Sequence, residues 1–248
     1  MNIEKINRKR ERLELEFKLK LDLVFRKQFA EFERAVDRNP KGAVKNIDKY
    51  FEKGIEPVYR QMIIKTARAF QINEKELLKA GFWENLINDF LEKNGGDRIT
   101  EIIDFSRRYV IQRLRPILTE GISNGEGISV ISRKIIKEIG EYKGRFATYR
   151  AERIARTEIV GTSNWASINS AKATGLGKKL KKKWLASVDG RERDTHREMN
   201  SKRAIEMDEF FEVRRVDGGF DKMQYPGDPR GSAGNVINCR CAIIYERA

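Results

Sequence analysis

Nearly all of the chain before residue 175 has the composition and apolar spacing of α-helix, and this constrains the fold more than any other feature. Leu, Glu, Lys, Arg and Phe dominate the first 38 residues, and all are tolerated in helices. After Gly175, short apolar stretches alternate with Gly, Asp and Pro loops, which is typical of a small sheet with long connections. We therefore expect an α+β protein. Its mainly helical N-terminal part is followed by a long helix and a small mixed or antiparallel sheet with long loops.

The arm at residues 3–38 contains two conflicting signals. From residue 13 to residue 23, apolar side chains alternate strictly with charged ones, which is the pattern of a half-buried strand. Between Phe25 and Val36 the apolar residues recur at spacings of three and four, and no turn signal separates the two halves. We predict a helix over the whole arm, with a strand at 11–25 as the alternative.

Breakers divide the rest of the helical region into shorter segments. Asn39-Pro40 ends the arm, because a residue before proline avoids the helical region. Pro116 is expected to bend or fray the helix that contains it. The predicted segments are helices at about 42–53, 58–70, 77–94, 100–118, 129–140 and 144–174, with a loop at 121–127. We place a domain boundary near residue 122, giving a helical N-terminal region, 1–122, and a C-terminal domain, 123–248.

Composition excludes several classes of protein. No run of 18 apolar residues occurs, so no membrane-spanning helix is expected. The N-terminus lacks the apolar stretch of a secretory signal. The chain has two cysteines, which lie two residues apart and cannot form a disulfide scaffold, so a reducing compartment is expected.

The formal net charge of +14 calls for an explanation, such as a negatively charged binding partner. The excess lies in the N-terminal arm and across residues 101–200, and no acid occurs between Glu158 and Asp189. Such a field attracts nucleic acid or an acidic protein surface. The candidate phosphate contacts, which would not select sequence, are Lys178, Lys179, Lys181, Lys182 and Lys183. The alternative is a solvated connector.

The only histidine, His196, and the only two cysteines, Cys239 and Cys241, all lie near the C-terminus. Cys-x-Cys on a strand puts both sulfurs on one face, within reach of a single ion. Imidazole is a standard third ligand, and Asp189 or Asp194 is a candidate fourth. This predicts a structural zinc site. The alternative is two buried, inert thiols and a surface imidazole.

Glu158 shares one face of the long predicted helix with Gly161 and Trp165. A carboxylate on an apolar stripe needs a cation or hydrogen-bond donors. Arg191 or Arg193 is a candidate partner, and a catalytic role for Glu158 is the functional alternative.

The motifs of the C-terminal half, taken in order, form a larger pattern. They are Arg156-Thr157-Glu158 on the long helix, Lys183-Trp184 on a strand, Asp189-x-Arg191-x-Arg193-x-x-His196, Pro226-Gly227-Asp228-Pro229 and Asn238-Cys239-Arg240-Cys241. Together they resemble the phage Mu F-like family of minor head proteins, also called the phage head morphogenesis domain. The resemblance covers about residues 125–248, and the order and spacing of the motifs are specific where each motif alone is weak.

The resemblance implies a non-enzymatic virion protein of a tailed bacteriophage, assembled in the host bacterial cytoplasm. Such proteins associate with the portal protein or the major capsid protein and with packaged double-stranded DNA at the portal vertex, and they assist head morphogenesis and DNA delivery. The helical region 1–122 would make the portal or capsid contact. No toxin domain of the kind that some relatives carry after this domain is expected.

One departure from the family pattern affects the metal prediction. Many relatives have Cys-x-x-Cys where this chain has Arg193 and His196. The ligand set implied by the resemblance is thereby reduced to His196, Cys239 and Cys241, with Asp189 as the fourth. A salt bridge from Arg193 to Glu158 or Asp189, formed in place of the metal, is the alternative.

Two other functions are weighed against the head protein. A metal-dependent nuclease or other small hydrolase would use His196, Cys239 and Cys241, with Glu158, but soft thiols do not suit the hard cations that most nucleases bind. A host nucleic-acid-binding regulator would show helix-turn-helix, zinc-finger or RNA-binding aromatic spacing, and none is found. The sequence favours the head protein.

Overall fold

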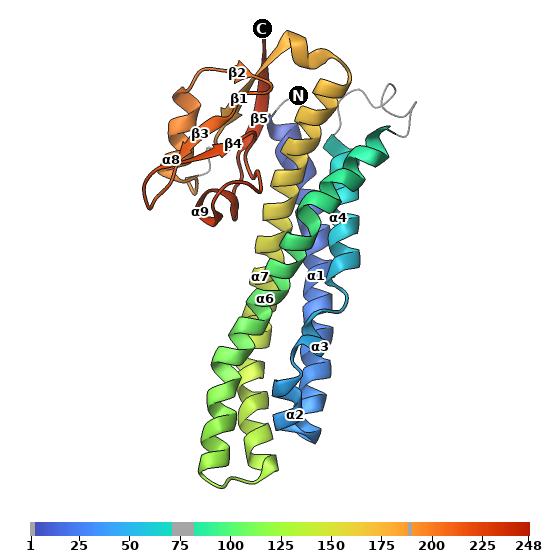
Figure 1. Cartoon of the computed structure of the whole chain (residues 1–248), viewed down its shortest axis with the longest axis vertical. Helices are drawn as coiled ribbons and strands as arrows, with labels where there is room; N and C mark the ends of the chain where they lie inside the picture. The colour runs from blue at the N-terminus through green and yellow to red at the C-terminus, as the bar shows by residue number, and fades with distance from the viewer. Residues whose placement is uncertain (1–2, 71–81, 188–189) are drawn as a thin grey trace. The chain divides into compact units, whose positions relative to one another are not determined.

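The computed structural model describes residues 3–70, 82–187 and 190–248 and confirms the predicted α+β class (Figure 1). The helices are α1 (Ile3–Arg38), α2 (Pro40–Lys45), α3 (Asp48–Phe51), α4 (Ile55–Phe70), α6 (Phe82–Ser123), α7 (Ile128–Ala173), α8 (Asp194–Arg197) and α9 (Ala233–Val236), with 3-10 turns η2 (Leu176–Lys179) and η3 (Glu198–Ser201). The strands are β1 (Leu180–Leu185), β2 (Ile205–Glu206), β3 (Phe211–Arg214), β4 (Phe220–Met223) and β5 (Ala242–Arg247).

The N-terminal arm is a single helix, α1, so the strand alternative at 11–25 is wrong. Its alternating apolar residues form two stripes, each with a spacing of four. One stripe is buried and consists of Leu13, Phe17, Leu21 and Phe25. The other is more than half exposed and consists of Leu15, Leu19 and Leu23. Because residues four apart lie on the same side of a helix, strict alternation along the sequence is compatible with one buried face.

The predicted breaks at Gly95-Gly96 and Gly140 are also wrong. Helix α6 continues through both glycines and Pro116, and α7 continues through Gly140. A glycine inside a helix costs only about 1 kcal/mol relative to alanine. Buried apolar residues on both sides of these glycines, such as Leu91 and Ile102 in α6, offset that cost. The predicted loop at 121–127 is correspondingly shorter, because α6 extends to Ser123.

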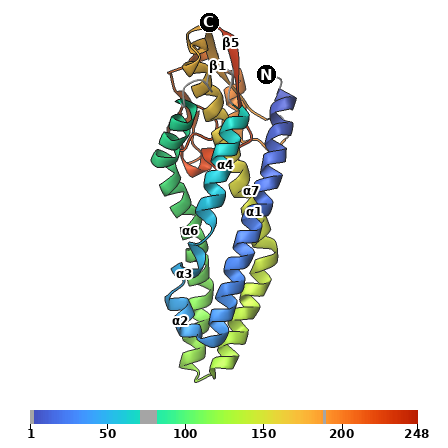
Figure 2. The same ribbon diagram turned by 90° about the vertical axis from the view of Figure 1, so that its right-hand side faces the viewer.

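The chain forms two compact units, and each draws on separate stretches of sequence. Residues 17–59 and 95–152 form the all-helical unit. Its core contains Phe29, Phe32, Val36, Ala43, Val44, Ile47, Phe51, Leu114, Leu118, Ile131, Ile135 and Ile139. The rings of Phe29 and Phe51 meet edge to face at 5.2 Å, which holds α3 against α1. Figure 2 shows α2 and α3 beside the lower part of α1. Asn39 ends α1 and caps α2, since its Oδ1 accepts a hydrogen bond from Gly42 N at 2.9 Å.

Residues 1–16, 60–94 and 153–248 form the second unit, which contains every strand found among the described residues. Helix α7 ends where Gly175 takes a left-handed φ of 73°, and the chain then enters β1. An antiparallel sheet has the order β2-β1-β5, with Trp184 opposite Ile243, and β3 pairs with β4 in a separate hairpin. The small sheet with long connections predicted from sequence is therefore confirmed.

No helix within residues 3–70, 82–187 and 190–248 has the length and apolarity needed to cross a bilayer. The boundary predicted near residue 122 falls at the end of α6, beside the turn that leads into α7. The division into sequence domains 1–122 and 123–248 stays a prediction, because each compact unit includes residues from both sides of it.

Candidate metal centre

Two chain segments bring together the histidine and the two cysteines predicted as ligands. His196 lies on the short helix α8, while Cys239 and Cys241 lie between α9 and β5. His196 Nδ1 is 3.4 Å from Cys241 Sγ and 3.7 Å from Cys239 Sγ. Among the described residues, only these three side chains form such a group, with ligand atoms within 4.8 Å of one another.

These atoms fit a tetrahedral zinc ion. Zn–N bonds of about 2.1 Å and Zn–S bonds of about 2.3 Å at the tetrahedral angle put nitrogen and sulfur about 3.6 Å apart. The two observed separations, 3.4 and 3.7 Å, lie on either side of that value. The same separations allow S–H···N hydrogen bonds, so the three side chains form a polar cluster with or without an ion. The donor set and its spacing therefore agree with the predicted site.

The two thiols differ in acidity because they share hydrogen bonds. A hydrogen bond from Cys239, together with His196, holds the pKa of Cys241 well below that of a free thiol. The same contact with Cys241, together with burial, raises the pKa of Cys239. One sulfur of the pair is therefore ready to act as a thiolate, which is the form that binds metal.

A relay of polar side chains orients the His196 ring. Asp221 Oδ2 accepts a hydrogen bond from Asn235 Nδ2 at 2.8 Å, which turns Asn235 Oδ1 toward His196 Nε2, 3.3 Å away. An amide oxygen only accepts, so Nε2 carries the proton. The other ring nitrogen, Nδ1, faces the two sulfurs. Supports of this kind behind a ligating histidine fix its tautomer and orientation.

The centre is closed to solvent. His196, Cys239 and Cys241 are 1%, 2% and 1% exposed. The buried indole of Trp184 packs edge-on against the His196 ring at 5.4 Å and against Phe211 at 5.5 Å. A catalytic metal needs an open position for substrate or water, whereas a structural metal does not. The enclosure therefore favours a structural role.

Arg156 and Thr157 of α7 hold the residue that precedes Cys239. Asn238 takes a left-handed φ of 60°, which is uncommon outside glycine. Its backbone N donates to Thr157 Oγ1 at 2.9 Å, and its Oδ1 accepts from Arg156 Nη1 at 2.8 Å. Two motifs that lie about 80 residues apart thus fix the entry to the Cys-x-Cys segment.

A second helix-to-loop contact fixes the Pro226–Pro229 turn. Asn164 of α7 donates from Nδ2 to Pro226 O at 2.9 Å and to Cys241 O at 3.2 Å. The buried carboxylate of Asp228 accepts from Gln224 N at 2.7 Å and from the Arg230 guanidinium. The turn is therefore part of the scaffold around the centre.

Comparison with known proteins now decides the family. The family described as Phage Mu protein F like protein matches residues 112–244, which is more than half of the chain. The chain belongs to the Phage Mu protein F-like family. This match agrees with the resemblance that the order and spacing of the sequence motifs indicated.

Three curated relatives are similar over part of their length. A protein named NAD(+)--arginine ADP-ribosyltransferase EFV of Enterococcus faecalis is 30% identical over 68% of this chain and 32% of its own. Minor head protein GP7 of Bacillus phage SPP1 is 29% identical over 59% of this chain and 44% of its own. The uncharacterized protein YqbB of Bacillus subtilis is 25% identical over 61% and 46%. This chain thus matches less than half the length of each. No solved structure matches.

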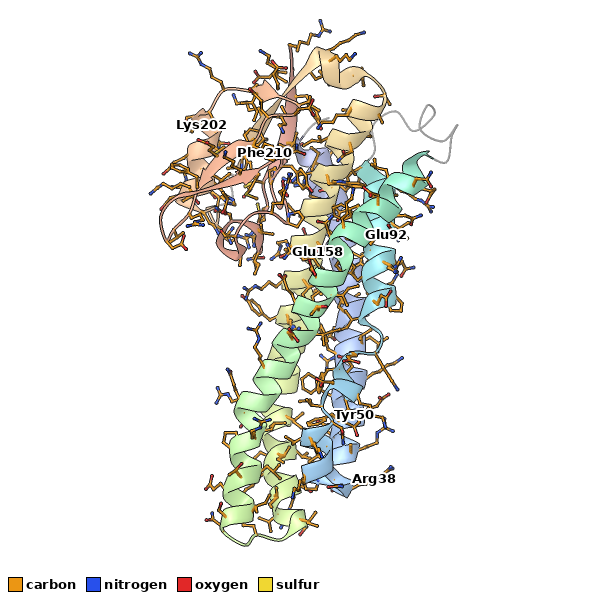
Figure 3. The ribbon with its side chains drawn as sticks, viewed as in Figure 1. Arg38, Tyr50, Glu92, Glu158, Lys202 and Phe210 are labelled. Atoms are coloured by element: carbon orange, nitrogen blue, oxygen red, sulfur yellow. The ribbon has the colours of Figure 1, made fainter. Side chains whose placement is uncertain are left out.

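The structure places the Mu F-like motif residues in different surroundings. Arg193 Nη2 donates to Ile237 O at 2.5 Å, beside the Cys-x-Cys segment, and a salt bridge of Arg193 with Glu158 or Asp189 stays a prediction. Glu158 is half-buried on α7 and is not in the ligand group (Figure 3). Arg191 and Arg240 line a cavity of about 680 Å³ next to the first turns of α1.

The two predicted fourth ligands have different outcomes. Asp194 pairs with Arg197 at 3.2 Å and is 84% exposed, so it is not a ligand. Asp189, the residue favoured by the sequence, lies outside the described residues.

The predicted DNA-binding lysines divide into three groups. Lys182 is fully buried and donates to Gln224 O at 3.1 Å, so its assignment as a phosphate contact is wrong. Lys181 and Lys183 form cross-strand ion pairs, with Glu206 at 3.1 Å and Glu246 at 3.5 Å. Lys178 and Lys179 on η2 are exposed. The burial follows from strand alternation, which turns every second residue of β1 inward.

Sequence reasoning missed several supporting residues. Asn235 and Asp221 orient His196, and Arg10, on the N-terminal helix, reaches Cys241. A polar residue in a loop or a basic arm carries no local mark of such a role, because its partners lie far away in sequence.

Proposed function

We propose that this Mu F-like chain is a minor head protein of a tailed bacteriophage, with an architectural rather than an enzymatic role. It contacts the portal protein or the major capsid protein at the portal vertex and assists head assembly and DNA delivery. The observation that carries the proposal is that part-buried hydrogen bonds, such as Arg156 to Asn238, join the family motifs, while His196, Cys239 and Cys241 are closed to solvent. The minor head protein GP7 of phage SPP1, named above, supports the same reading.

Binding measurements test the architectural role. Labelled protein is titrated with the purified portal protein and with the major capsid protein of the same phage. Saturable binding to either one is expected, and the major tail protein serves as the control. Binding to neither would contradict the proposal.

Packaged double-stranded DNA is the second proposed partner, bound without sequence selectivity. The net charge of +14 and the exposed Lys178 and Lys179 support it. Counterion release makes such binding weaken steeply with salt. Titration of linear DNA at rising NaCl should show that dependence, and binding that is insensitive to salt would argue against phosphate contacts.

His196, Cys239 and Cys241 are proposed to hold one structural Zn²⁺. The ion would tie together loops that have little core of their own, as in small zinc domains where metal binding supplies folding free energy. Elemental analysis of protein purified without chelators should find close to one zinc per chain. A Cys239→Ser, Cys241→Ser variant should lose the zinc. A clearly sub-stoichiometric value in the unmodified protein rejects the site.

The enzymatic alternative is tested separately. A hydrolase that depends on the centre would cleave DNA, lose activity with a chelator, and lose it again in the His196→Ala variant. We expect no cleavage above background in any of these samples. Cleavage by the unmodified protein that the variant abolishes would overturn the architectural assignment.

A further inference from the structure

Arg10 is a buried guanidinium on the N-terminal helix, and its hydrogen bonds join that helix to α7 and to the backbone of Cys241. The residue is 4% exposed. Its Nε donates to Ser163 Oγ at 2.8 Å and its Nη2 to Asn164 Oδ1 at 2.8 Å. Its Nη1 donates to the backbone oxygen of Cys241 at 3.1 Å.

The carbonyl of Cys241 is therefore held from two helices. Asn164 Nδ2, on α7, donates to the same oxygen at 3.2 Å. Asn164 Oδ1 also accepts from Ile243 N at 3.1 Å, which fixes the start of β5. Without Arg10, the backbone oxygen of Cys241, a predicted ligand, would accept one hydrogen bond instead of two.

The next turn of α1 reaches the other end of the ligand segment. Glu14 lies four residues after Arg10 and accepts from Arg156 Nε at 3.1 Å. The same Arg156 side chain donates to Asn238, the residue before Cys239. One face of α1 thus supports the segment 238–241 at both ends, directly at Cys241 and through Arg156 at Asn238.

The charge of Arg10 needs compensation, because an isolated buried cation is costly. No carboxylate among the described residues forms an ion pair with it that meets the 4.0 Å distance for a salt bridge, and its three acceptors are neutral oxygens. Burial lowers the pKa of Arg10 to about 10, and the nearby Cys239, Glu14 and Cys241 oppose that change. A zinc ion bound by two thiolates and a neutral imidazole carries no net charge, so the support that Arg10 gives to the ligand segment is positional and comes from its hydrogen bonds.

We propose that docking of the first turns of α1, residues 3–16, and metal loading at His196, Cys239 and Cys241 are coupled through Arg10. Arg10 is a positioning residue: it touches the backbone of one ligand and not the ion. Coupling of this kind is reciprocal, so the metal stabilises the docked helix by the same factor by which the docked helix tightens metal binding. The inference rests on the proposed zinc centre.

Hydrogen exchange of the unmodified protein tests the coupling without any substitution. Amide exchange is compared for the zinc-loaded protein and for protein stripped with a chelator. Exchange over residues 3–16 should accelerate on stripping, because local opening is governed by local stability. Residues 40–51 in α2 and α3, which belong to the other compact unit, serve as the internal control. Equal exchange over 3–16 in both samples would overturn the proposal.

Substitution of Arg10 tests the reverse direction. Zinc affinity is measured by competition with a chromogenic chelator for Arg10→Ala, Arg10→Lys and Arg12→Ala, the last being an exposed arginine on the same helix. We expect Arg10→Ala to weaken zinc binding about 10- to 100-fold, as removal of supporting groups around metal sites does. Arg12→Ala should leave the affinity unchanged, and Arg10→Lys, which keeps the charge but not the fork of donors, should fall between.

The outcomes separate the two proposals. Zinc binding that is the same with and without Arg10 rejects the coupling and leaves the metal centre standing. Absence of zinc binding by the unmodified protein rejects both. Loss of zinc from Arg12→Ala to the same extent as from Arg10→Ala would show a general effect of charge rather than positioning, and would also overturn the proposal.

Discussion

Gly161 of α7 and Gly227 of the Pro226–Pro229 turn touch backbone to backbone. A Cβ built on Gly161 would lie 2.7 Å from Gly227 O, and one built on Gly227 would lie 2.8 Å from Gly161 Cα. Gly227 also takes a φ of +80°, which side chains rarely adopt. This contact brings the turn close enough for Asn164 to bond Pro226 O.

Gly161→Ala is therefore expected to destabilise the fold by about 1–3 kcal/mol, the usual cost of forcing extra volume into a packed site. The neighbour is backbone and has no flexible end that can move aside. Gly140→Ala is the matched control, because it lies in the same helix and an added Cβ would meet nothing within 4 Å apart from its chain neighbours and the helix's own backbone. It should stabilise by about 0.5–1 kcal/mol. Chemical denaturation measures both, and equal effects would disprove the close contact.

The two stripes of α1 predict opposite responses to the same substitution. Leu21→Ala removes a fully buried side chain and should cost about 2–5 kcal/mol. Leu19→Ala, two residues away and 60% exposed, should change stability by no more than about 0.5 kcal/mol. Urea unfolding of the two variants is the measurement. A large loss from Leu19→Ala would mean that this face is covered.

The lysines of 178–183 should contribute unequally to DNA binding. Changing Lys178 and Lys179 to Gln should reduce the salt slope by up to about 1.8, at about 0.9 for each phosphate contact. Changing Lys181 and Lys183, which already pair with Glu206 and Glu246, should have a smaller effect. Affinity measured over a range of NaCl concentrations compares the pairs. A larger effect from Lys181 and Lys183 would contradict the assignment.

The buried Lys182 predicts a dependence of stability on pH. Burial lowers its pKa from 10.5 to about 8. Between these values the unfolded chain binds the proton and the folded chain does not, so this group makes stability rise with pH there. Lys182→Met removes that contribution. The difference in Tm, variant minus unmodified protein, should be largest below about pH 8 and should fall toward pH 10.5. A pH-independent difference would show that the ammonium is not desolvated.

Much of the site could be anticipated because its chemistry is rare in the chain. With one histidine and two cysteines in all, a soft ligand set had few possible members, and the fold brings those members together. The Arg156-Thr157 and Asn238 motifs were recognisable as a pattern, but their mutual contact was not. Strand alternation within β1 would have separated Lys182 from Lys181 and Lys183, yet the run of like charges suggested a uniform surface.

The sequence by itself determined the helical character up to residue 175, the small sheet after it, and the identity of the candidate metal-ligating residues, because these depend on local spacing and on residue chemistry. The tertiary structure alone decided that α6 and α7 run through their glycines, that the exposed stripe of α1 is the one with Leu19, and that Arg10 reaches Cys241. Those outcomes depend on partners tens to hundreds of residues away. Burial energy from such partners outweighs a local preference of about 1 kcal/mol.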